Sequence, residues 1–282
     1  MTRFFMKFIA LLALIAASCL AYGFFIEPKR LVIKHHTVEV SNALERPLKI
    51  GVISDIHIGG YHMPPKRVEK IISRLNRFDL NMVLIAGDFI NGHKPRAETS
   101  KEFDAIIDAG LKAFNQLQSS YGSFAVIGNH DVWYDPSYVE EALEAANVST
   151  LTNEALQIES NICLVGLADN MTQKEDPKSF SGCKENNFII AVMHSPDSFR
   201  VLRSDVQFAV AGHTHAGQIN IPMFADYSHI IELSREYKYG LEVYNGVPVY
   251  VSAGLGTSVL PARFRAPPEI TIITLESQKG SQ

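Results

Sequence analysis

Short hydrophobic runs separated by polar clusters make up most of the chain after Pro47. Nearly continuous apolar runs of this length are typical of strands that are buried on both faces of a sheet. The pattern predicts such strands at 49–54, 82–86, 124–127, 188–193 and 208–211.

Three stretches repeat hydrophobic residues at helical spacing, which predicts helices with one buried face. Because they separate predicted strands, they favour strand–helix–strand units. The apolar positions are Val68, Ile71, Ile72 and Leu75 in the first stretch and Phe103, Ile106, Ile107, Leu111, Phe114 and Leu117 in the second. The third stretch covers residues 138–146 and opens at Pro136.

The C-terminal part has a different pattern. Residues 239–244 and 247–253 flank Asn245-Gly246, a dipeptide preferred in type I′ turns, and predict a β-hairpin. Residues 269–275 alternate as one more strand, and residues 28–45 alternate in part and are expected to be extended. The chain is therefore expected to be α/β (α+β) with mixed strand directions.

The N-terminal region predicts a membrane anchor. Residues 8–26 are 19 consecutive residues without a charge, enough for a helix that crosses the roughly 30 Å hydrocarbon core. A cleaved signal peptide and a buried core helix are the alternatives, but the run is longer than a usual signal and Ala17-Ser18-Cys19 is a poor cleavage site. The expected parts are a transmembrane anchor at 1–27, a lead-in at 28–46, a domain at 47–276 and a tail at 277–282.

The orientation of this anchor is left open by its flanking charges. Lys29, Arg30 and Lys34 on one side offset Arg3 and Lys7 on the other under the positive-inside rule. The expected location is the inner membrane of a bacterium, with a single-pass anchor.

Charge and cysteine content exclude several classes of protein. The net charge of −4 argues against a protein that binds nucleic acid by neutralising phosphates. The three cysteines contain no Cys-x-x-Cys pair, which excludes a cysteine zinc finger and a disulfide scaffold. Cys163 and Cys183 would pair only in an exported domain, and two free thiols are the simpler expectation.

Residues able to bind metal follow five of the predicted strands. Because the carboxyl ends of such strands converge on one crevice, these nitrogen and oxygen donors are expected to meet there. Imidazole and carboxylate donors suit Mn, Fe or Zn, and their number exceeds what one tetrahedral ion takes. Each residue alone is weak evidence for a metal site. Their occurrence together, each directly after a predicted strand, is strong evidence. The donors are Asp55, His57, Asp88, Asn129, His194, His213 and His215.

The ordered blocks of these residues resemble those of the calcineurin-like metallophosphoesterase superfamily, over about residues 48–275. The blocks are Asp55-Ile56-His57, Gly87-Asp88, Gly128-Asn129-His130-Asp131, His194 and Gly212-His213-Thr214-His215. Glu27-Pro28-Lys29-Arg30, Gly217-Gln218 and Pro267-Pro268-Glu269-Ile270 are similar to the membrane-anchored bacterial branch. The resemblance implies a four-layer αββα sandwich of two mixed sheets.

The resemblance also implies a centre with two divalent metal ions, manganese first, with iron or zinc as alternatives. Its ions lower the pKa of a bound water, which gives the hydroxide that attacks phosphorus. His130 matches the histidine that stabilises or protonates the leaving oxygen. The ligand sets are Asp55, His57, Asp88 and His215 for one ion, and Asp88, Asn129, His194 and His213 for the other.

Departures from the family pattern bear on the substrate. The arginine that would bind a phosphoprotein is missing after Asp88, which argues against that substrate class. Asn91 stands where an aspartate would often orient the catalytic histidine, and Asp131 replaces a frequent glutamate beside the ligands.

The anchor favours a lipid-linked phosphorylated substrate, and UDP-2,3-diacylglucosamine, cleaved in lipid A synthesis, is the leading candidate from the resemblance. Arg263 and Arg265 are candidates for binding a diphosphate, with a solvated basic loop as the alternative. The candidates for lining a groove that binds the acyl chains are Phe224, Tyr227, Leu260 and Phe264. The alternative is that these residues pack in the core.

Three other functions remain as alternatives. They are a broad-specificity phosphodiesterase for another lipid or nucleotide, a non-catalytic interaction module on the same fold, and a zinc hydrolase for peptides or nucleobases. The complete set of ligand-type residues argues against the module, and the absence of His-Glu-x-x-His argues against a zinc peptidase.

Overall fold

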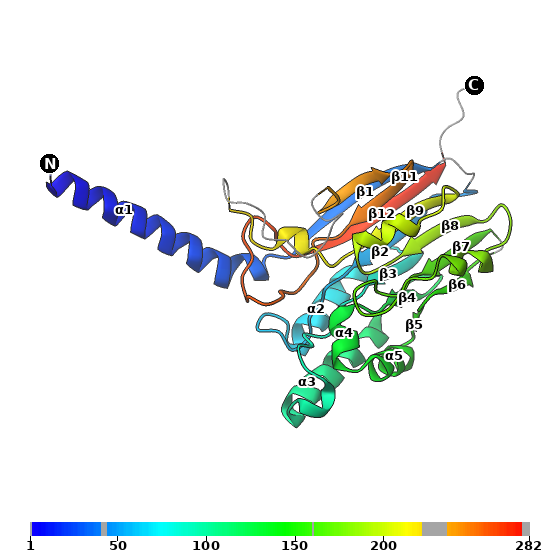
Figure 1. The fold of residues 1–282 in the computed structure, drawn as a ribbon, viewed down its shortest axis with the longest axis horizontal. Helices are drawn as coiled ribbons and strands as arrows, with labels where there is room; N and C mark the ends of the chain where they lie inside the picture. Colours follow the sequence, from blue (N-terminus) through cyan, green and yellow to red (C-terminus); the bar gives the residue numbers. More distant parts are fainter. Residues whose placement is uncertain (1, 41–43, 160, 222–235, 278–282) are drawn as a thin grey trace, which may run out of the picture.

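Two packed β-sheets form the body of the protein (Figure 1). The computed structural model describes residues 2–40, 44–159, 161–221 and 236–277. Within them each sheet has six strands. The first sheet runs in the order β1 (Val32–Val40), β12 (Glu269–Ser277), β2 (Leu48–Ile53), β3 (Met82–Ala86), β4 (Ser123–Val126) and β5 (Val148–Thr150). The second runs β10 (Gly240–Tyr244), β11 (Val247–Val251), β9 (Val206–Ala211), β8 (Phe188–Val192), β7 (Ile162–Gly166) and β6 (Glu154–Gln157).

Both sheets are mixed, as expected. In the first, β2 to β5 are parallel, whereas β12 is antiparallel to β2 and parallel to β1. The residues expected to form an extended lead-in thus supply β1, a strand of this sheet. In the second, β7, β8, β9 and β11 are parallel, and β6 and β10 pair antiparallel at the two edges.

The predicted hairpin is confirmed by the pairing of β10 with β11. Tyr244 pairs with Val247 across Asn245 and Gly246, whose φ angles of 48° and 86° suit a type I′ turn. The sequence pattern did not predict β5, β6 and β7. The first two are short and half-exposed, so they lack a continuous apolar run.

Alternating side chains of the central strands divide the core into layers. Ile50, Val52 and Leu84 pack between the sheets against residues of the second sheet such as Ile190 and Phe208. The opposite face of the first sheet is covered by α2 (Pro65–Leu75), α3 (Lys101–Lys112) and α5 (Pro136–Ala145). The outer face of the second sheet is covered by the 3₁₀ helices η5 (Pro177–Gly182) and η6 (Pro196–Val201). The two-sheet α/β sandwich is therefore confirmed, with 3₁₀ helices in its fourth layer.

The predicted helices form with small differences in extent. The four apolar residues expected on the first helix are the buried residues of α2. The second stretch is wrong in part, because Ile106 is 39% exposed and α3 ends at Lys112, where the 3₁₀ helix η4 (Ala113–Gln116) follows. Further short helices are α4 (Asn129–Tyr134), η3 (Arg96–Glu98) and η7 (His215–Gly217).

Helix α1 (Thr2–Ala21) projects away from the sandwich (Figure 1). It continues through the π-helix η1 (Tyr22–Ile26) into the 3₁₀ helix η2 (Glu27–Lys29). The region is long and apolar enough to cross a membrane, and only 6% of its most apolar window is buried. This low burial contradicts the alternative of a buried core helix.

Cys163 and Cys183 form a disulfide, with their Cα atoms 5.7 Å apart. The expectation of two free thiols is therefore wrong. The bond joins β7, the strand next to the edge strand β6, to the end of η5, which lies over the outer face of the second sheet.

Candidate metal centre

The predicted ligands meet at the carboxyl ends of the strands that they follow. This arrangement follows from the parallel pairing of those strands within each sheet and from the packing of the two sheets. The residues are Asp55 and His57 after β2, Asp88 after β3, Asn129 after β4, His194 after β8, and His213 and His215 after β9.

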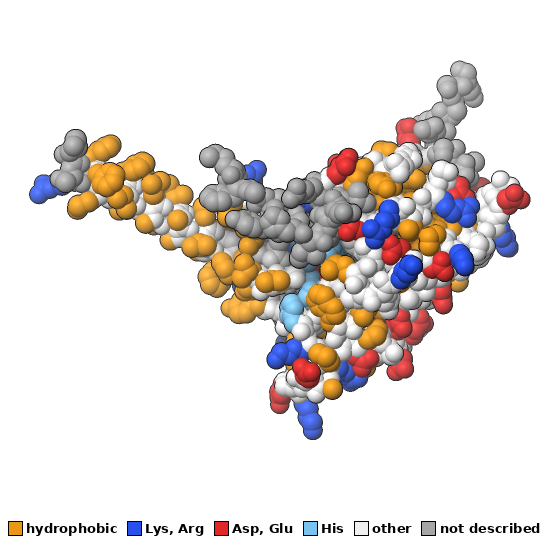
Figure 2. Space-filling view, viewed as in Figure 1, with side chains coloured by type: hydrophobic (Ala, Val, Ile, Leu, Met, Phe, Trp, Pro, Cys, Tyr) orange, Lys and Arg blue, Asp and Glu red, His pale blue; other side chains and the backbone are white. Residues whose placement is uncertain are grey.

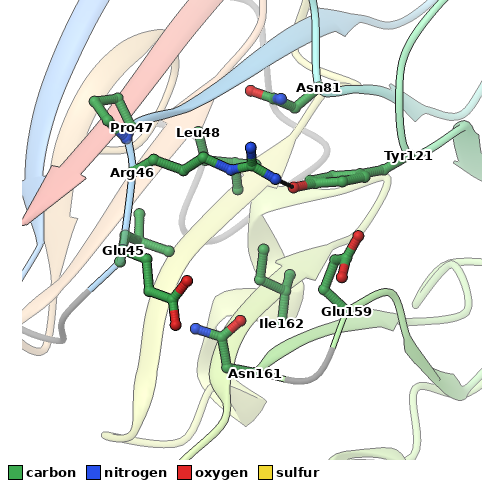
Figure 3. Close-up of a pocket in the computed structure, with 10 residues that line it drawn as sticks. Glu45, Arg46, Pro47, Leu48, Asn81, Tyr121, Glu159, Asn161 and Ile162 are labelled. Carbon is green, nitrogen blue, oxygen red and sulfur yellow. Dashed lines mark hydrogen bonds between the residues drawn. The ribbon is translucent and has the colours of Figure 1, made fainter.

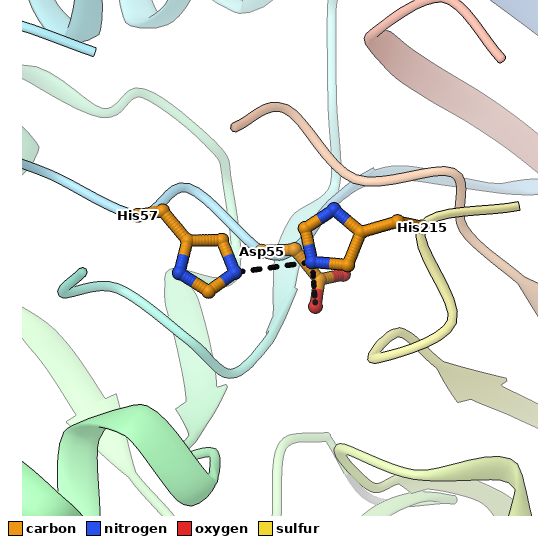
Figure 4. Close-up of side chains that lie close together, drawn as sticks. All are labelled: Asp55, His57 and His215. Carbon is orange, nitrogen blue, oxygen red and sulfur yellow. Dashed lines mark hydrogen bonds and ion pairs between the residues drawn. The ribbon is translucent and has the colours of Figure 1, made fainter. Parts of the chain in front are cut away.

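Two imidazoles and a carboxylate form a first group (Figure 4). His57 Nε2 lies 3.1 Å from His215 Nε2, which lies 3.6 Å from Asp55 Oδ1. His57 Nε2 is also 3.6 Å from Asp88 Oδ2. All four side chains are buried. Their donor atoms therefore converge on one small volume.

A second group forms around His194. Its Nδ1 pairs with the Ala86 carbonyl at 2.8 Å, which directs Nε2 toward the group. This Nε2 lies 3.3 Å from Asp88 Oδ2, 3.1 Å from Asn129 Oδ1 and 3.0 Å from His213 Nδ1. Asp88 is thus common to both groups.

The spacing within each group fits ligands around a metal ion. Bonds of about 2.0–2.2 Å at tetrahedral angles place ligand atoms about 3.3–3.6 Å apart. The separations in these groups run from 3.0 to 3.6 Å. These histidine and aspartate side chains are positioned to bind metal ions, and their donor atoms suit Mn, Fe or Zn.

Backbone strain is concentrated at these residues. Five of the seven have a positive φ, a conformation that costs a non-glycine residue about 1–3 kcal/mol and persists only where the surroundings enforce it. Such outliers cluster at functional sites. The angles are 48° at Asp55, 52° at His57, 55° at Asp88, 70° at His213 and 51° at His215.

Burial keeps most of the imidazoles neutral. It lowers the pKa of His57 and of His213 to about 3, and that of His215 well below its ordinary value. Desolvation disfavours the charged form of a histidine, so these rings are neutral at pH 7. Neutral imidazole is the form that binds a metal.

Asp88 and His194 are held as an ion pair. Burial opposes both charges, but the charge and hydrogen bond of Asp88 raise the pKa of His194 well above its ordinary value. The same contacts hold the pKa of Asp88 well below its usual range. The carboxylate common to both groups is therefore negative at neutral pH.

His130 lies beside the donor groups. Its Nδ1–H donates to the Gly92 carbonyl at 2.9 Å, which leaves Nε2 directed away from that carbonyl, 3.4 Å from Ser258 Oγ. Its backbone N–H donates to Asp88 Oδ1 at 2.9 Å, and its ring centre is 4.8 Å from that of His57. Burial lowers the pKa of His130.

The predicted role of Asn91 needs correction. The carbonyl of Gly92, one residue further on, holds Nδ1 of His130 in its place. The side chain of Asn91 lies against Gly60 instead. A backbone carbonyl fixes the tautomer of the ring without adding a charge beside it.

Asp131 joins two of the ligand loops. Its Oδ1 accepts the Ile90 N–H at 3.0 Å and its Oδ2 accepts the Gly128 N–H at 2.9 Å. Burial and the neighbouring Asp88 raise the pKa of Asp131 to about 7. The side chain therefore acts on the site by fixing the backbone next to Asp88 and Asn129.

We expect Asp131→Ala to lower the free energy of unfolding by about 2–4 kcal/mol, because two buried N–H groups lose their acceptor at about 1–3 kcal/mol each. Urea unfolding measures this change. Asp131→Asn keeps one acceptor and should lose less. Equal stability of the alanine variant and the unsubstituted chain would contradict this role.

Arg263 is buried instead of lining a substrate site. It has no exposed surface, and its guanidinium donates to the carbonyls of Gly256, Ala253 and Ala266 at 2.7–2.9 Å. Its Nη2 lies 3.2 Å from His215 Nδ1. Burial lowers its pKa to about 10. With its donors committed to the backbone, this side chain braces the loop behind His215.

Among the described residues, no hydrogen bond joins the other predicted substrate contacts to the donor groups. Arg265 is exposed, and Phe264 packs edge-on against Tyr22 at the end of the apolar helix. Leu260 is half-exposed at the surface. Phe224 and Tyr227 lie outside the described residues.

Two glutamates that were not predicted to act near the site brace its loops. Glu27 Oε1 accepts the Ala266 N–H at 2.7 Å, and Glu269 Oε1 accepts the Tyr250 hydroxyl at 2.6 Å and the Ala253 N–H at 3.1 Å. Both belong to motifs typical of the anchored branch. The sequence motifs singled out these two glutamates, but their role in bracing the loops is seen only from their hydrogen bonds in the structure.

A pocket at the other end of the strands carries none of this chemistry (Figure 3). It is lined by residues at the amino ends of the strands, such as Asn81 and Ile162, and by Arg46, which donates to Tyr121 at 3.0 Å. No histidine lines it. It is therefore separate from the donor groups, which lie at the carboxyl ends.

The sandwich of two mixed sheets, with paired histidine and aspartate groups at its carboxyl edge, defines a protein built to hold metal ions. The family model of the calcineurin-like phosphoesterases matches residues 48–217, which contain all seven predicted ligands. The chain belongs to this family.

Several relatives are similar over most of the chain. An uncharacterized metallophosphoesterase of Helicobacter pylori is 30% identical over 241 residues, covering 82% of this chain and 60% of that protein. Phosphodiesterase YaeI of Escherichia coli is 25% identical over 266 residues, covering 92% and 93%. A zebrafish transmembrane protein with a metallophosphoesterase domain is 28% identical over 289 residues, covering 94% and 62%. The chain thus spans about 60% of the length of the Helicobacter relative.

Proposed function

We propose that the chain is a membrane-anchored phosphoesterase that hydrolyses a phosphodiester or diphosphate bond in a lipid-linked substrate. The observation that carries this proposal is that Asp88 lies within 3.6 Å of an imidazole from each donor group, with His130 close to both His57 and Asp88. Two ions held by one bridging ligand suit phosphoryl transfer, because they can contact both the attacking and the leaving oxygen. The name of the YaeI relative, a phosphodiesterase, supports the same reaction class.

Each donor group is assigned one divalent ion, manganese first, with iron or zinc as alternatives. When bound, the ions supply Lewis-acid stabilisation of phosphoryl oxygens and a water of lowered pKa. The chain keeps the imidazoles of His57, His213 and His215 neutral and braces the loops that carry the donors. The assigned ligands are Asp55, His57, Asp88 and His215 for one ion, and Asp88, Asn129, His194 and His213 for the other.

His130 is proposed to act on the leaving oxygen. Its Nδ1–H is committed to Gly92, so Nε2 is the atom that can exchange a proton or a hydrogen bond with the substrate. The Gly92 carbonyl fixes the tautomer of the ring, and the donation of the residue's own N–H to Asp88 Oδ1 fixes its position.

Helix α1 supports an anchor in a bacterial inner membrane. Its length, apolar composition and low burial suit a lipid environment. The zebrafish relative, named a transmembrane protein, supports a membrane location but does not bear on which membrane. An anchored site is close to lipid headgroups, which favours a lipid-linked substrate over a soluble one.

The disulfide bears on the side of the membrane and so on the substrate. Disulfides persist in oxidising compartments, so the Cys163–Cys183 bond supports an exported domain. UDP-2,3-diacylglucosamine is made on the cytoplasmic side and requires a cytoplasmic site. We therefore favour a lipid phosphodiester at the outer face of the inner membrane over this diphosphate.

The experiment for the substrate offers both lipids in vesicles to the full chain with Mn²⁺. Hydrolysis of a phospholipid diester such as phosphatidylglycerol, with UDP-2,3-diacylglucosamine untouched, supports the proposal. Cleavage of UDP-2,3-diacylglucosamine alone would assign the lipid A reaction instead. Binding of both lipids without hydrolysis would favour a non-catalytic module.

We expect His130→Ala to keep its metal content and lose about 10²–10⁴-fold in kcat, the range typical of a lost general acid or base. Metal analysis and hydrolysis of bis-p-nitrophenyl phosphate measure the two effects. His93→Ala is the matched control, because the ring of His93 lies edge-on to that of His130, with centroids 4.7 Å apart, but contributes to neither donor group. Loss of metal together with activity in His130→Ala would instead make this residue a ligand.

A further inference from the structure

The end of the apolar helix is bound into the loops around the metal centre. The Gly23 carbonyl accepts the Arg263 N–H at 2.9 Å, and Glu27 Oε1 accepts the Ala266 N–H. The Pro28 carbonyl accepts Arg67 Nη2 at 2.5 Å. The helix is therefore fixed to the domain at the edge that carries the site, rather than joined to it by a free linker.

Two surface segments connect this junction to the site. His62 pairs with the Pro261 carbonyl at 2.9 Å, and Arg67 Nη1 donates to the His62 carbonyl at 3.1 Å. At the other end of the 258–261 segment, Ser258 Oγ lies 3.4 Å from His130 Nε2. A surface that runs from the helix to His130 is thus held together by hydrogen bonds.

Large hydrophobic side chains are exposed on these two segments. We call Tyr61, Val259 and Leu260 the apolar rim; they are 72%, 85% and 50% exposed. The exposed Phe25 and Ile26 end the apolar helix close by, since Gly23 contacts the loop that follows the rim. Figure 2 shows hydrophobic side chains covering the helix and continuing at its junction with the domain.

Val259 is exposed and strained at once. Its φ is 61°, and the Leu260 N–H donates back to the Ser258 carbonyl at 2.6 Å, which makes a γ-turn of the rare form with a positive central φ. A β-branched residue is a clear outlier in this conformation. Gln218 holds the turn by donating to the Ser258 and Leu260 carbonyls. The fold therefore keeps an unfavourable residue pointing outward beside the site.

We propose that the apolar rim lies in the headgroup region of the bilayer, so that the site opens onto the membrane surface and takes the phosphate of an embedded lipid. The proposal rests on the proposed function and specifies how the substrate reaches the site. The bilayer is the occupant because the rim continues the apolar surface of the helix. Exposed Lys29, Arg30 and Lys66 beside it suit anionic headgroups.

The location of the rim is tested without any activity. Full chains with Cys19→Ser keep the Cys163–Cys183 disulfide and carry one free cysteine, at Val259 or, as a matched control, at Val243, which is 61% exposed near the far end of β10. Each cysteine carries an environment-sensitive fluorophore, and the chain is placed in phosphatidylethanolamine–phosphatidylglycerol vesicles. We expect lipid-borne quencher to act on the Val259 probe and aqueous iodide on the Val243 probe. Iodide quenching at both positions, or shielding of Val259 from both quenchers by a protein partner, would overturn the proposal.

A second test uses activity: one substitution should lower hydrolysis of a membrane substrate without lowering the stability of the protein. Asparagine adopts a positive φ more readily than valine, so Val259→Asn should have a Tm at or above that of the unsubstituted chain. Hydrolysis of a vesicle-embedded phosphodiester should fall at least about tenfold, because a polar group replaces one in lipid contact. Hydrolysis of soluble bis-p-nitrophenyl phosphate should not change.

Val243→Asn should change neither activity. An equal loss on both substrates in Val259→Asn, or no loss on the vesicle substrate, would contradict the membrane role of the rim. If the unsubstituted chain hydrolyses neither substrate, the proposed function fails, and the quenching result still decides where the rim lies.

Discussion

Asp88→Asn should remove metal binding and activity together, with a loss of at least about 10³-fold in kcat/KM, since it removes a charge that both ions use. Its Oδ2 lies within 3.6 Å of one imidazole from each donor group, His57 and His194. An amide has the same size but lacks the negative charge that balances two divalent ions. Metal analysis of the purified full chain and diester hydrolysis measure the two losses.

Asp79→Asn is the matched control, because Asp79 is an exposed carboxylate outside both groups. It should keep metal and activity. Circular dichroism of Asp88→Asn and of the EDTA-treated unsubstituted chain separates loss of metal from loss of fold. Full activity of Asp88→Asn would show that this carboxylate does not bridge two ions.

Arg263→Ala should lower the free energy of unfolding by about 3–5 kcal/mol, the largest effect on stability expected from a single substitution here. Three buried carbonyls would lose their donors, at about 1–3 kcal/mol each, and a cavity would form beside His215. The loop that holds the end of the apolar helix through Gly23 and Glu27 would lose its brace as well. Thermal unfolding should show a Tm lower by about 6–20 °C for a domain of this size.

Arg265→Ala tests whether this loss follows from the buried contacts. Arg265 is exposed two residues away, with no salt bridge identified for its side chain among the described residues. Its replacement should change stability by no more than about 0.5 kcal/mol. Similar Tm values for the two variants would contradict the bracing role of Arg263.

The strands that carry the site were predictable because a strand buried on both faces has a continuous run of apolar residues. The run at 82–86 coincides with β3, and the stripe from Val68 to Leu75 coincides with the buried face of α2. The edge strand β6 has no continuous apolar run, since its side chains are partly exposed. The stripe that begins at Phe103 was misleading at Ile106, which lies within α3 but is 39% exposed, and it also extended beyond Lys112, where α3 ends.

The donor groups were predictable for a related reason. Residues that directly follow buried parallel strands must meet at one edge, whatever the loops between them do. Arg263 and Asn91 were misjudged because a loop position does not reveal which way its side chain points. Arg263 points inward and donates to backbone carbonyls. Nδ1 of His130 is bound by the Gly92 carbonyl instead of the side chain of Asn91. The pairing of Cys163 with Cys183 likewise depends on how η5 packs over β7.

The most direct test of the central claim is metal content combined with diesterase activity in one preparation of the full chain. We expect two divalent ions per chain and Mn-dependent hydrolysis of bis-p-nitrophenyl phosphate, both removed by EDTA and both restored by Mn²⁺. A chain that hydrolyses the diester equally well after its metal has been removed, or that binds no metal at the donor groups, would contradict that claim.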